Sequence, residues 1–250
     1  MTGLDQLAVL GAGLFAGTIN TIVGSGSLLT FPTLLAFGFP PVVANVSNTV
    51  GLVPGSVSGA WGYRRELAGQ RRRLVRFNVV AGIGGLTGAV LLLVLPAAAF
   101  KDIVPALIIL ACVLVIAQPA ITRRLEQWRR GPARDDGGPL LLAALFGTGV
   151  YGGYFGAAQG VMFLAILGIG LRDDLQRLNA AKNIIAAVVN GLAGILFIAV
   201  AHVAWRPAIL LAVGSIAGGQ VGAKVGRRLP AVGLRAIIVV VGIIAVVKLL

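Results

Sequence analysis

Charged residues and cysteine are both scarce in this sequence. Only 12% of its 250 residues are Asp, Glu, Lys or Arg, and 58% are hydrophobic. A soluble domain carries about 25% charged residues, so this chain has too few charges to cover a water-exposed surface. The single cysteine, Cys112, excludes an intrachain disulfide and any metal site built from several cysteines. We therefore expect an integral membrane protein surrounded by a lipid bilayer.

Acidic residues are absent from every long apolar segment. All eight lie between such segments or near the start of the chain: Asp5, Glu66, Asp102, Glu126, Asp135, Asp136, Asp173 and Asp174. Carriers of metal cations and proton relays usually place Asp or Glu within the membrane, so a cationic substrate is disfavoured. No hydrolase, zinc-protease or phosphate-binding motif is present either. We predict no enzyme activity, no catalytic residue, no metal and no cofactor.

Basic residues give the chain a formal net charge of +13 and gather in four short gaps. These gaps cover residues 64–76, 123–134, 172–177 and 224–235. Cytoplasmic loops of membrane proteins are enriched in Lys and Arg, so we predict a multi-pass protein of the inner (plasma) membrane with its basic loops in the cytoplasm. We expect no nucleic-acid binding, because these charges lack a solvated platform.

Segments without charge predict where the chain crosses the bilayer. A crossing helix needs roughly 20 apolar residues, and such helices are predicted over 42–63, 74–95, 103–122, 178–202, 207–225 and 231–249. Two further segments, 6–38 and 139–171, have 33 residues each, which is too long for one crossing and short for two. Each contains a glycine cluster in its middle. We predict that both are re-entrant hairpins, broken near mid-membrane.

The order of these elements repeats along the chain. Residues 1–122 and 139–250 each consist of a broken hairpin followed by three transmembrane helices, and residues 123–138 form a cytoplasmic connector. Three crossings is an odd number, so the two halves have opposite orientations in the membrane. The predicted fold is an all-α polytopic membrane protein made of two inverted-topology repeats, a plan that many transporters share.

The two hairpin breaks are the candidate binding site. Each precedes a short helix, whose free amide groups and positive dipole end would attract an anion. A polar cluster opens the long helix after each hairpin, and Lys182 is the cation placed deepest in an apolar segment. The candidate residues are Gly24, Ser25, Gly26, Ser27, Asn45, Ser47, Asn48, Gln159, Gly160, Asn179, Lys182 and Asn183. The alternatives are glycines that serve packing, Asn and Ser residues that only bridge helices, and a Lys182 that extends to the membrane surface.

Three stretches of the first half together resemble a known family of membrane proteins. They are AGTINTIVGSGSLLTFP at residues 16–32, PVVANVSN at residues 41–48 and GAWGYR at residues 59–64. With them the chain resembles the sulfite exporter TauE/SafE family of membrane permeases. The resemblance implies secondary transport of sulfur-containing anions such as sulfite, thiosulfate or organosulfonates, for example sulfoacetate. It favours the first glycine break, together with Asn20 and the Asn45–Asn48 cluster, as the functional region.

The predicted function is secondary transport of a small anion by alternating access between the two halves. A passive anion channel is the first alternative, because it could use the same helix dipoles. A non-transporting membrane scaffold is the second. The expected partners are the anionic substrate and the lipid bilayer, and both a monomer and a homodimer remain open.

Overall fold

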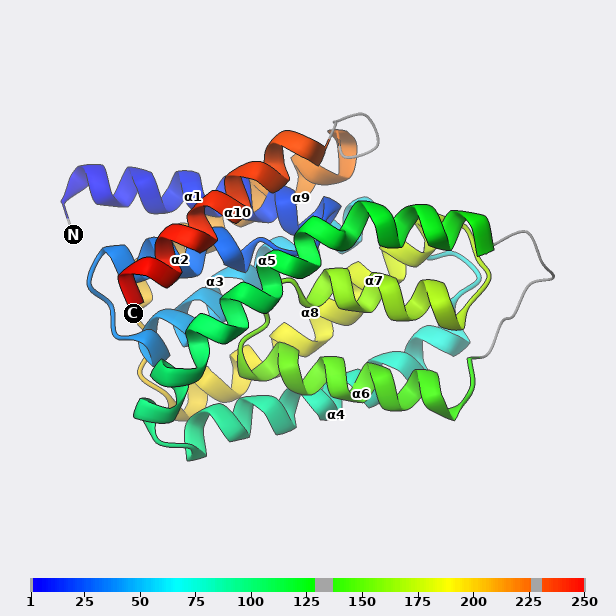
Figure 1. Ribbon diagram of the computed structural model, residues 1–250, viewed down its shortest axis with the longest axis horizontal. Coiled ribbons are helices and arrows are strands. Elements are labelled where there is room, and N and C mark those ends of the chain that lie inside the picture. Colours follow the sequence, from blue (N-terminus) through cyan, green and yellow to red (C-terminus); the bar gives the residue numbers. More distant parts are fainter. Residues whose placement is uncertain (1, 129–136, 226–230, 250) are drawn as a thin grey trace.

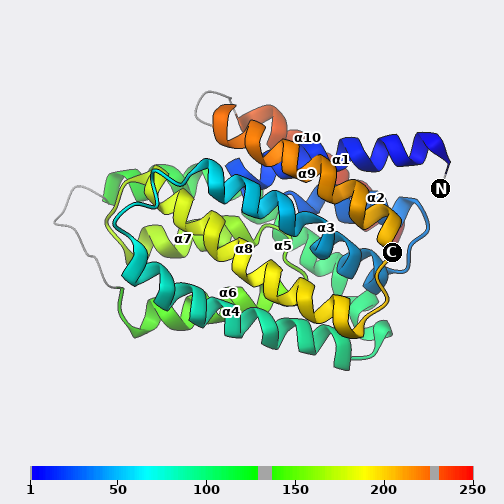
Figure 2. The same cartoon turned by 180° about the vertical axis from the view of Figure 1, so that it is seen from behind.

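The computed structural model describes residues 2–128, 137–225 and 231–249, and every regular element in this part of the chain is a helix. Figures 1 and 2 show the helices running mostly along the long axis of the molecule. Their bounds are α1 Gly3–Ile22, α2 Ser27–Ala36, α3 Pro41–Gly62, α4 Arg71–Val94, α5 Ala97–Trp128, α6 Pro139–Tyr154, α7 Gln159–Gly170, α8 Leu175–Val200, α9 Trp205–Val225 and α10 Ala231–Leu249.

Both glycine clusters interrupt a helix, as the hairpin prediction requires. Helix α1 stops one residue before Val23, and Gly24 follows with φ 89°. Helix α6 stops before Phe155, and Gly156 follows with φ 76°. Glycine enters this left-handed region without the steric cost that a side chain adds. Each hairpin therefore turns where the sequence supplies a glycine.

The helices of the two halves pack against one another in exchanged pairs. Helix α1 packs along α9, and α6 packs along α4. In the same way α2 packs against α10, and α7 packs against α5, while α3 and α8 contact each other. Each hairpin is therefore held by helices of the other half of the chain as well as by its own.

Glycines allow the closest of these approaches. A Cβ atom on Gly149 of α6 would lie 2.3 Å from the carbonyl oxygen of Ala81 in α4, and one on Gly17 of α1 would lie 2.4 Å from that of Ser215 in α9. Small residues let membrane helices approach one another closely. In lipid the hydrophobic effect does not drive helices together, so close van der Waals packing stabilises the contact instead. Here the glycines serve packing.

We expect Gly149→Ala to destabilise the protein by about 1–3 kcal/mol, the usual cost of an atom forced into a packed contact. Gly147→Ala, on the same helix, is the matched control, because a Cβ at position 147 meets no atom within 4 Å. Thermal unfolding in detergent should show a lower transition for Gly149→Ala and an unchanged or higher one for Gly147→Ala. Equal transitions would contradict the close α4–α6 contact.

The surface of the helix bundle is strongly apolar. On α4, Val75, Val79, Ile83, Leu86 and Val90 recur at helical spacing, and each is at least 37% exposed. Such a stripe is typical of a lipid-facing helix, because water would penalise so much exposed apolar area.

Three of the described helices are long and apolar enough to cross a membrane: Arg71–Val94, Ala97–Leu125 and Leu175–Val200. This is fewer than the six crossings that the sequence predicts. Helix α3 carries Asn45, Ser47 and Asn48, whose side chains are buried inside the bundle. Polar residues that face inward lower the mean hydropathy of a helix without touching lipid.

The helix predicted to end at residue 122 is longer than expected. Helix α5 begins at Ala97 and runs through Trp128, so the first part of the predicted connector is helical. Arg, Leu, Glu and Gln all favour helix in water, and a charge-based boundary marks the edge of the apolar segment, not the end of the helix. The rest of the predicted connector, apart from residues 137–138, lies outside the described residues.

Candidate functional site

The two hairpin breaks meet inside the bundle. The amide of Gly160, in the first turn of α7, donates a hydrogen bond of 3.1 Å to the carbonyl oxygen of Gly24. A Cβ atom on either glycine would lie 2.5 Å from the Cα atom of the other. Residues 136 positions apart thus touch backbone to backbone, and only glycine at both positions permits it.

Some backbone amides at the start of the two short helices are bonded within the first turn of their own helix. In α2, the amides of Leu28 and Leu29 donate to Ser25 and Gly26 carbonyls at 3.1 and 3.0 Å. In α7, the amide of Val161 donates to the Ala158 carbonyl at 3.0 Å. Tight first turns of this kind satisfy amides that an α-helix leaves open. The amides of Ser25, Gly26 and Ala157 have no backbone partner among the described residues, so both backbone and side-chain donors are present near the breaks.

Lys182 of α8 reaches the end of the first hairpin helix. The side chain is buried, and its Nζ donates to the carbonyl oxygens of Asn20 and Thr21, at 3.3 Å each. The ammonium group therefore sits at the carbonyl end of α1, where the helix dipole favours a cation. The alternative that Lys182 extends to the membrane surface does not hold in this structure.

A small cavity lies beside the Lys182 ammonium group. It is lined by Asn20, Thr21, Gly24, Ser56, Gly160, Lys182, Asn183 and Ala186. Its volume of about 10 Å³ is the space that one water molecule needs. No carboxylate lines it, and its charged group is an ammonium. This lining suits a ligand that is either negatively charged or neutral and polar.

Two amide side chains complete the polar lining. Asn183 Nδ2 donates to the Thr21 carbonyl at 3.3 Å, next to Lys182. Asn20 Nδ2 donates to Ser56 Oγ at 3.3 Å across the α1–α3 contact. Five of the predicted site residues thus share one cavity: Asn20, Gly24, Gly160, Lys182 and Asn183.

The polar cluster of α3 bridges helices and lies away from this cavity. Asn45 Nδ2 donates to the Tyr154 carbonyl at 2.9 Å, at the carbonyl end of α6. Ser47 Oγ accepts from the Ala204 amide at 2.8 Å, and Asn48 Oδ1 accepts from the Thr30 hydroxyl. These three contacts fit the alternative in which Asn and Ser residues only bridge neighbouring parts of the bundle. Asn45 and Lys182 are related, since each binds the carbonyl end of the opposite half's hairpin helix.

The other predicted residues surround the breaks without lining the cavity. Gln159 Nε2 donates to Asn190 Oδ1 at 2.6 Å. Ser25 Oγ and Asn179 Oδ1 are buried and have no hydrogen-bond partner among the described residues. Gly26 packs against α1, where a Cβ would lie 2.3 Å from the Ala16 carbonyl, and Ser27 is half-buried at the start of α2.

Thr21, Ser56 and Asn190 are site or neighbouring residues that the sequence-based prediction missed. Ser56 lies between Gly55 and Gly59, a spacing typical of helix packing. Asn190 is the one polar side chain in the apolar second half of α8, and such residues usually face the protein interior. That rule would have identified Asn190 from the sequence.

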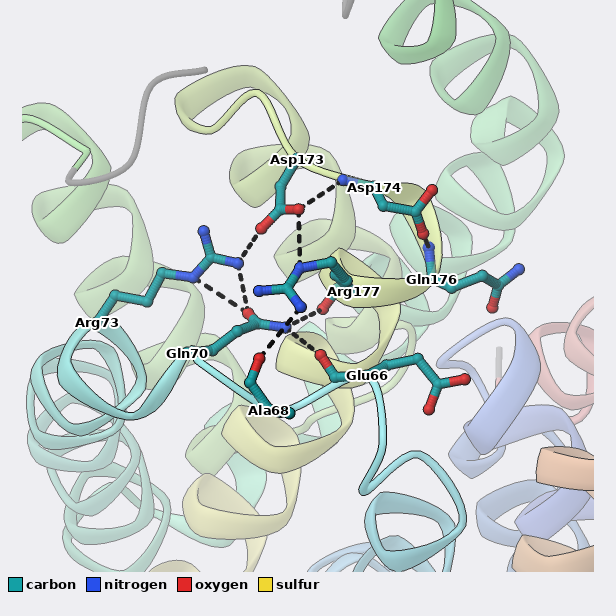
Figure 3. Close-up of polar contacts among 8 residues, drawn as sticks. All are labelled: Glu66, Ala68, Gln70, Arg73, Asp173, Asp174, Gln176 and Arg177. Atoms are coloured by element: carbon teal, nitrogen blue, oxygen red, sulfur yellow. Dashed lines mark hydrogen bonds and ion pairs between the residues drawn. The ribbon is translucent and has the colours of Figure 1, made fainter.

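An ion-pair network joins two loops at the basic end of the bundle, as Figure 3 shows. Asp173, after α7, pairs with Arg73 of α4 and with Arg177 Nε at 2.9 Å. Arg177 Nη1 donates to the Ala68 carbonyl at 3.1 Å, and Gln70 Nε2 donates to the Arg177 carbonyl at 3.3 Å. The α3–α4 loop and the exit of the second hairpin therefore lie together. This agrees with a hairpin that returns to the side it entered.

The network makes stability depend on pH. Burial raises the pKa of the Asp173 carboxyl, but hydrogen bonds from Arg73 and the Asp174 amide, together with the charges of Arg73 and Arg177, bring the pKa below its ordinary value of 3.8. A lowered pKa contributes stability that is present above the ordinary value and is lost as pH falls through the folded-state pKa. Asp173→Asn should therefore lower the unfolding temperature at pH 7, and the gap from wild type should narrow below about pH 4.

Asp102→Asn is the control for that measurement, because Asp102 is exposed and lies on α5, outside the network. A pH-independent gap between wild type and Asp173→Asn would contradict a stabilising role of the ionised carboxylate.

Comparison with known proteins identifies relatives over almost the whole chain. The family model described as sulfite exporter TauE/SafE matches residues 9–249. "Probable membrane transporter protein YfcA" of Escherichia coli (strain K12) is 29% identical, over 95% of this chain and 86% of its own length. A "Probable membrane transporter protein" of Haemophilus influenzae is 28% identical over 89% of this chain and 86% of its own, and "Probable membrane transporter protein ORF9" of Sinorhizobium sp. is 26% identical over 96% and 90%. No solved structure gives a significant match.

Proposed function

This chain belongs to the sulfite exporter TauE/SafE family of membrane proteins, and we propose that it is a secondary transporter that carries a small sulfur oxyanion or organosulfonate. The observation that carries the proposal is the buried ammonium of Lys182 at the meeting point of the two hairpin breaks. A cation inside a membrane protein is costly and marks a functional site by default.

The charge balance of the site favours an anion. Among the described residues, the hydrogen bonds of Lys182 go to carbonyl oxygens, which carry partial charges, and no carboxylate of this part of the chain lines its cavity. A bound oxyanion would supply the full counter-charge, with the amides of Asn20 and Asn183 as further donors. Charge-assisted hydrogen bonds of this kind are roughly twice as strong as neutral ones.

The size of the cavity supports transport by a moving site. A space for about one water molecule is too small for sulfite or thiosulfate. Binding therefore requires the hairpins to separate, which would also break the Gly160–Gly24 hydrogen bond and free that amide for the substrate. The exchanged packing of α1 with α9 and of α6 with α4 is what two inverted repeats would produce. Rocking of such repeats about a central site gives alternating access.

The orientation of the protein follows from its basic loops. The α3–α4 loop and the exit of the second hairpin carry Arg64, Arg65, Arg172 and Arg177 and are joined by the ion-pair network. We assign this end to the cytoplasm by the positive-inside rule, and the protein to the inner (plasma) membrane.

Flux of isotope-labelled anions into proteoliposomes tests the function. We expect saturable uptake of sulfite, thiosulfate or sulfoacetate that is accelerated by the same anion inside and resists competition by chloride and acetate. Exchange of this kind belongs to a carrier, whereas a passive channel would give flux that does not saturate. Absence of flux from correctly folded and inserted protein would refute the transport proposal, and competition by chloride at equal concentration would refute the sulfur-anion specificity.

A further inference from the structure

A polar hollow opens at the basic end of the bundle, beside α3 and α9. Its volume is about 290 Å³, far larger than the cavity at Lys182. Three cationic side chains line it, those of Arg64, Arg65 and Lys224, together with the Glu66 carboxylate and the Gln220 amide. The excess of positive charge over negative makes the hollow attractive to an anion.

Hydrogen bonds on two sides fix the segments that line the hollow. Glu66 belongs to the same loop as Ala68 and Gln70, which the Asp173 network of Figure 3 ties to Arg177. On the other side, Gln220 Nε2 donates to the Ser58 carbonyl at 2.8 Å, which fixes α9 against α3. A fixed arrangement of cations costs less to bind an anion than a flexible one.

A small buried cluster lies next to this hollow and includes a residue of the helix that carries Lys182. Tyr63, Ala180 and Ala223 form a small buried cluster, and Ala223 also lines the hollow. Ala180 precedes Lys182 by two residues, which is about 3 Å of helix rise. The side chain of Thr21, which lines the Lys182 cavity, packs against Gly59, where a Cβ would lie 2.4 Å from its Oγ1.

We propose that the hollow is a second anion site, where the transported oxyanion binds at the cytoplasmic face before it passes the Tyr63 cluster to reach Lys182. This inference rests on the proposed function, since it names the cytoplasmic route to the same site. Guanidinium groups match the oxygens of a sulfur oxyanion, because their donors bind two of them at once. Movement of Tyr63 and Ala223 apart opens the route.

The phosphate of an anionic lipid offers the same chemistry as the free substrate. The exposed Trp61 ring lies 5.4 Å from the Arg64 guanidinium carbon, at the rim of the hollow. The position of the hollow, next to the cluster that contains Ala180 of the Lys182 helix, favours the free oxyanion. Vesicles of two compositions separate the sources.

The first test removes single positive charges from the residues that line the hollow. It uses proteoliposomes with anion applied at the cytoplasmic face. Arg65→Gln and Lys224→Gln should each raise KM for thiosulfate by about three- to tenfold, with a smaller dependence on salt and an unchanged rate at saturation. Arg71→Gln and Arg72→Gln remove the same charge from exposed positions on α4 outside the hollow and are the matched controls. A KM no higher than that of these controls would overturn the proposal.

The lipid arm repeats these measurements in pure phosphatidylcholine and in phosphatidylcholine with phosphatidylglycerol. The proposal predicts the raised KM in both. An effect confined to vesicles with phosphatidylglycerol would assign the hollow to a lipid phosphate and overturn it. If wild-type protein carries no anion at all, the proposed function itself fails. If wild-type flux is normal and the KM values of Arg65→Gln and Lys224→Gln match those of the controls, only the second site is refuted.

The second test probes the Tyr63 cluster by cysteine labelling. Cys112 is the chain's single cysteine, so Cys112→Ala gives a background without thiols. In that background Ala180→Cys should react with a membrane-impermeant thiol reagent from the cytoplasmic face, and saturating thiosulfate should change the rate at least about threefold. Ser215→Cys, equally buried in the α1–α9 contact, is the control and should stay unreactive. An Ala180→Cys as unreactive as the control would contradict a route through this cluster.

Discussion

Lys182→Met is expected to abolish saturable anion flux while leaving the protein folded and inserted. Methionine nearly keeps the length of the side chain but removes the one charge that the described residues bring to the cavity beside the two breaks. Loss of one partner of a buried, hydrogen-bonded charge pair costs about 2–5 kcal/mol, which corresponds to a loss of flux of roughly 30- to 5,000-fold. Uptake of labelled thiosulfate into proteoliposomes measures it.

Two further variants separate the charge from the structural contacts of this side chain. Lys182→Gln keeps a donor for the carbonyls of Asn20 and Thr21 but has no charge, so it should fold like wild type and still fail to transport. Lys101→Met makes the same chemical change at an exposed position on α5 and should transport normally. Wild-type flux in Lys182→Gln would show that the ammonium only caps α1.

Gly160→Ala is expected to force the two hairpin breaks apart. The new Cβ would lie 2.5 Å from the Cα atom of Gly24, a backbone atom of the break that joins α1 to α2. Overpacking of this kind costs about 1–3 kcal/mol, and the displaced breaks carry the Lys182 cavity with them. We expect a lower unfolding temperature together with flux at least tenfold below wild type.

Gly191→Ala on α8 is the control, because a Cβ there meets no atom within 4 Å. Gly24→Ala should be worse than Gly160→Ala, because its φ of 89° adds about 1–2 kcal/mol for a residue with a side chain. Wild-type stability and flux in Gly160→Ala would contradict the backbone contact between the breaks.

The positions of the hairpins could be predicted because length and glycine together leave few alternatives. A charge-free segment of 33 residues with a glycine cluster in its middle predicts a break in the helix, and the structure interrupts both segments there, with Gly24 and Gly156 at positive φ. Family membership could be predicted too, from the stretches around Gly24 and Asn45, and the match over residues 9–249 confirms it.

The partners of individual side chains could not be predicted in this way. Lys182 and the Thr21 carbonyl are 161 residues apart, and nothing in either segment shows that the end of α1 needs a cap from α8. The polar cluster around Asn45 and that around Lys182 look alike in sequence, yet of these two it is the second that lines the cavity at the breaks. Likewise, local helix propensity past residue 122 outweighs the charge boundary, so α5 continues to Trp128.

The proposed mechanism depends on contact between the ammonium of Lys182 and the transported anion. The unfolding temperature of purified protein, measured as thiosulfate is added at constant ionic strength, tests this contact in wild type and in Lys182→Gln. A ligand at 100 times its Kd stabilises the folded state by about 2.7 kcal/mol. We therefore expect a saturating rise for wild type, no rise with chloride, and a clearly smaller rise for Lys182→Gln, which keeps the hollow at Lys224 as its site for thiosulfate. An equal rise in both proteins would show that thiosulfate does not bind Lys182 and would refute this role.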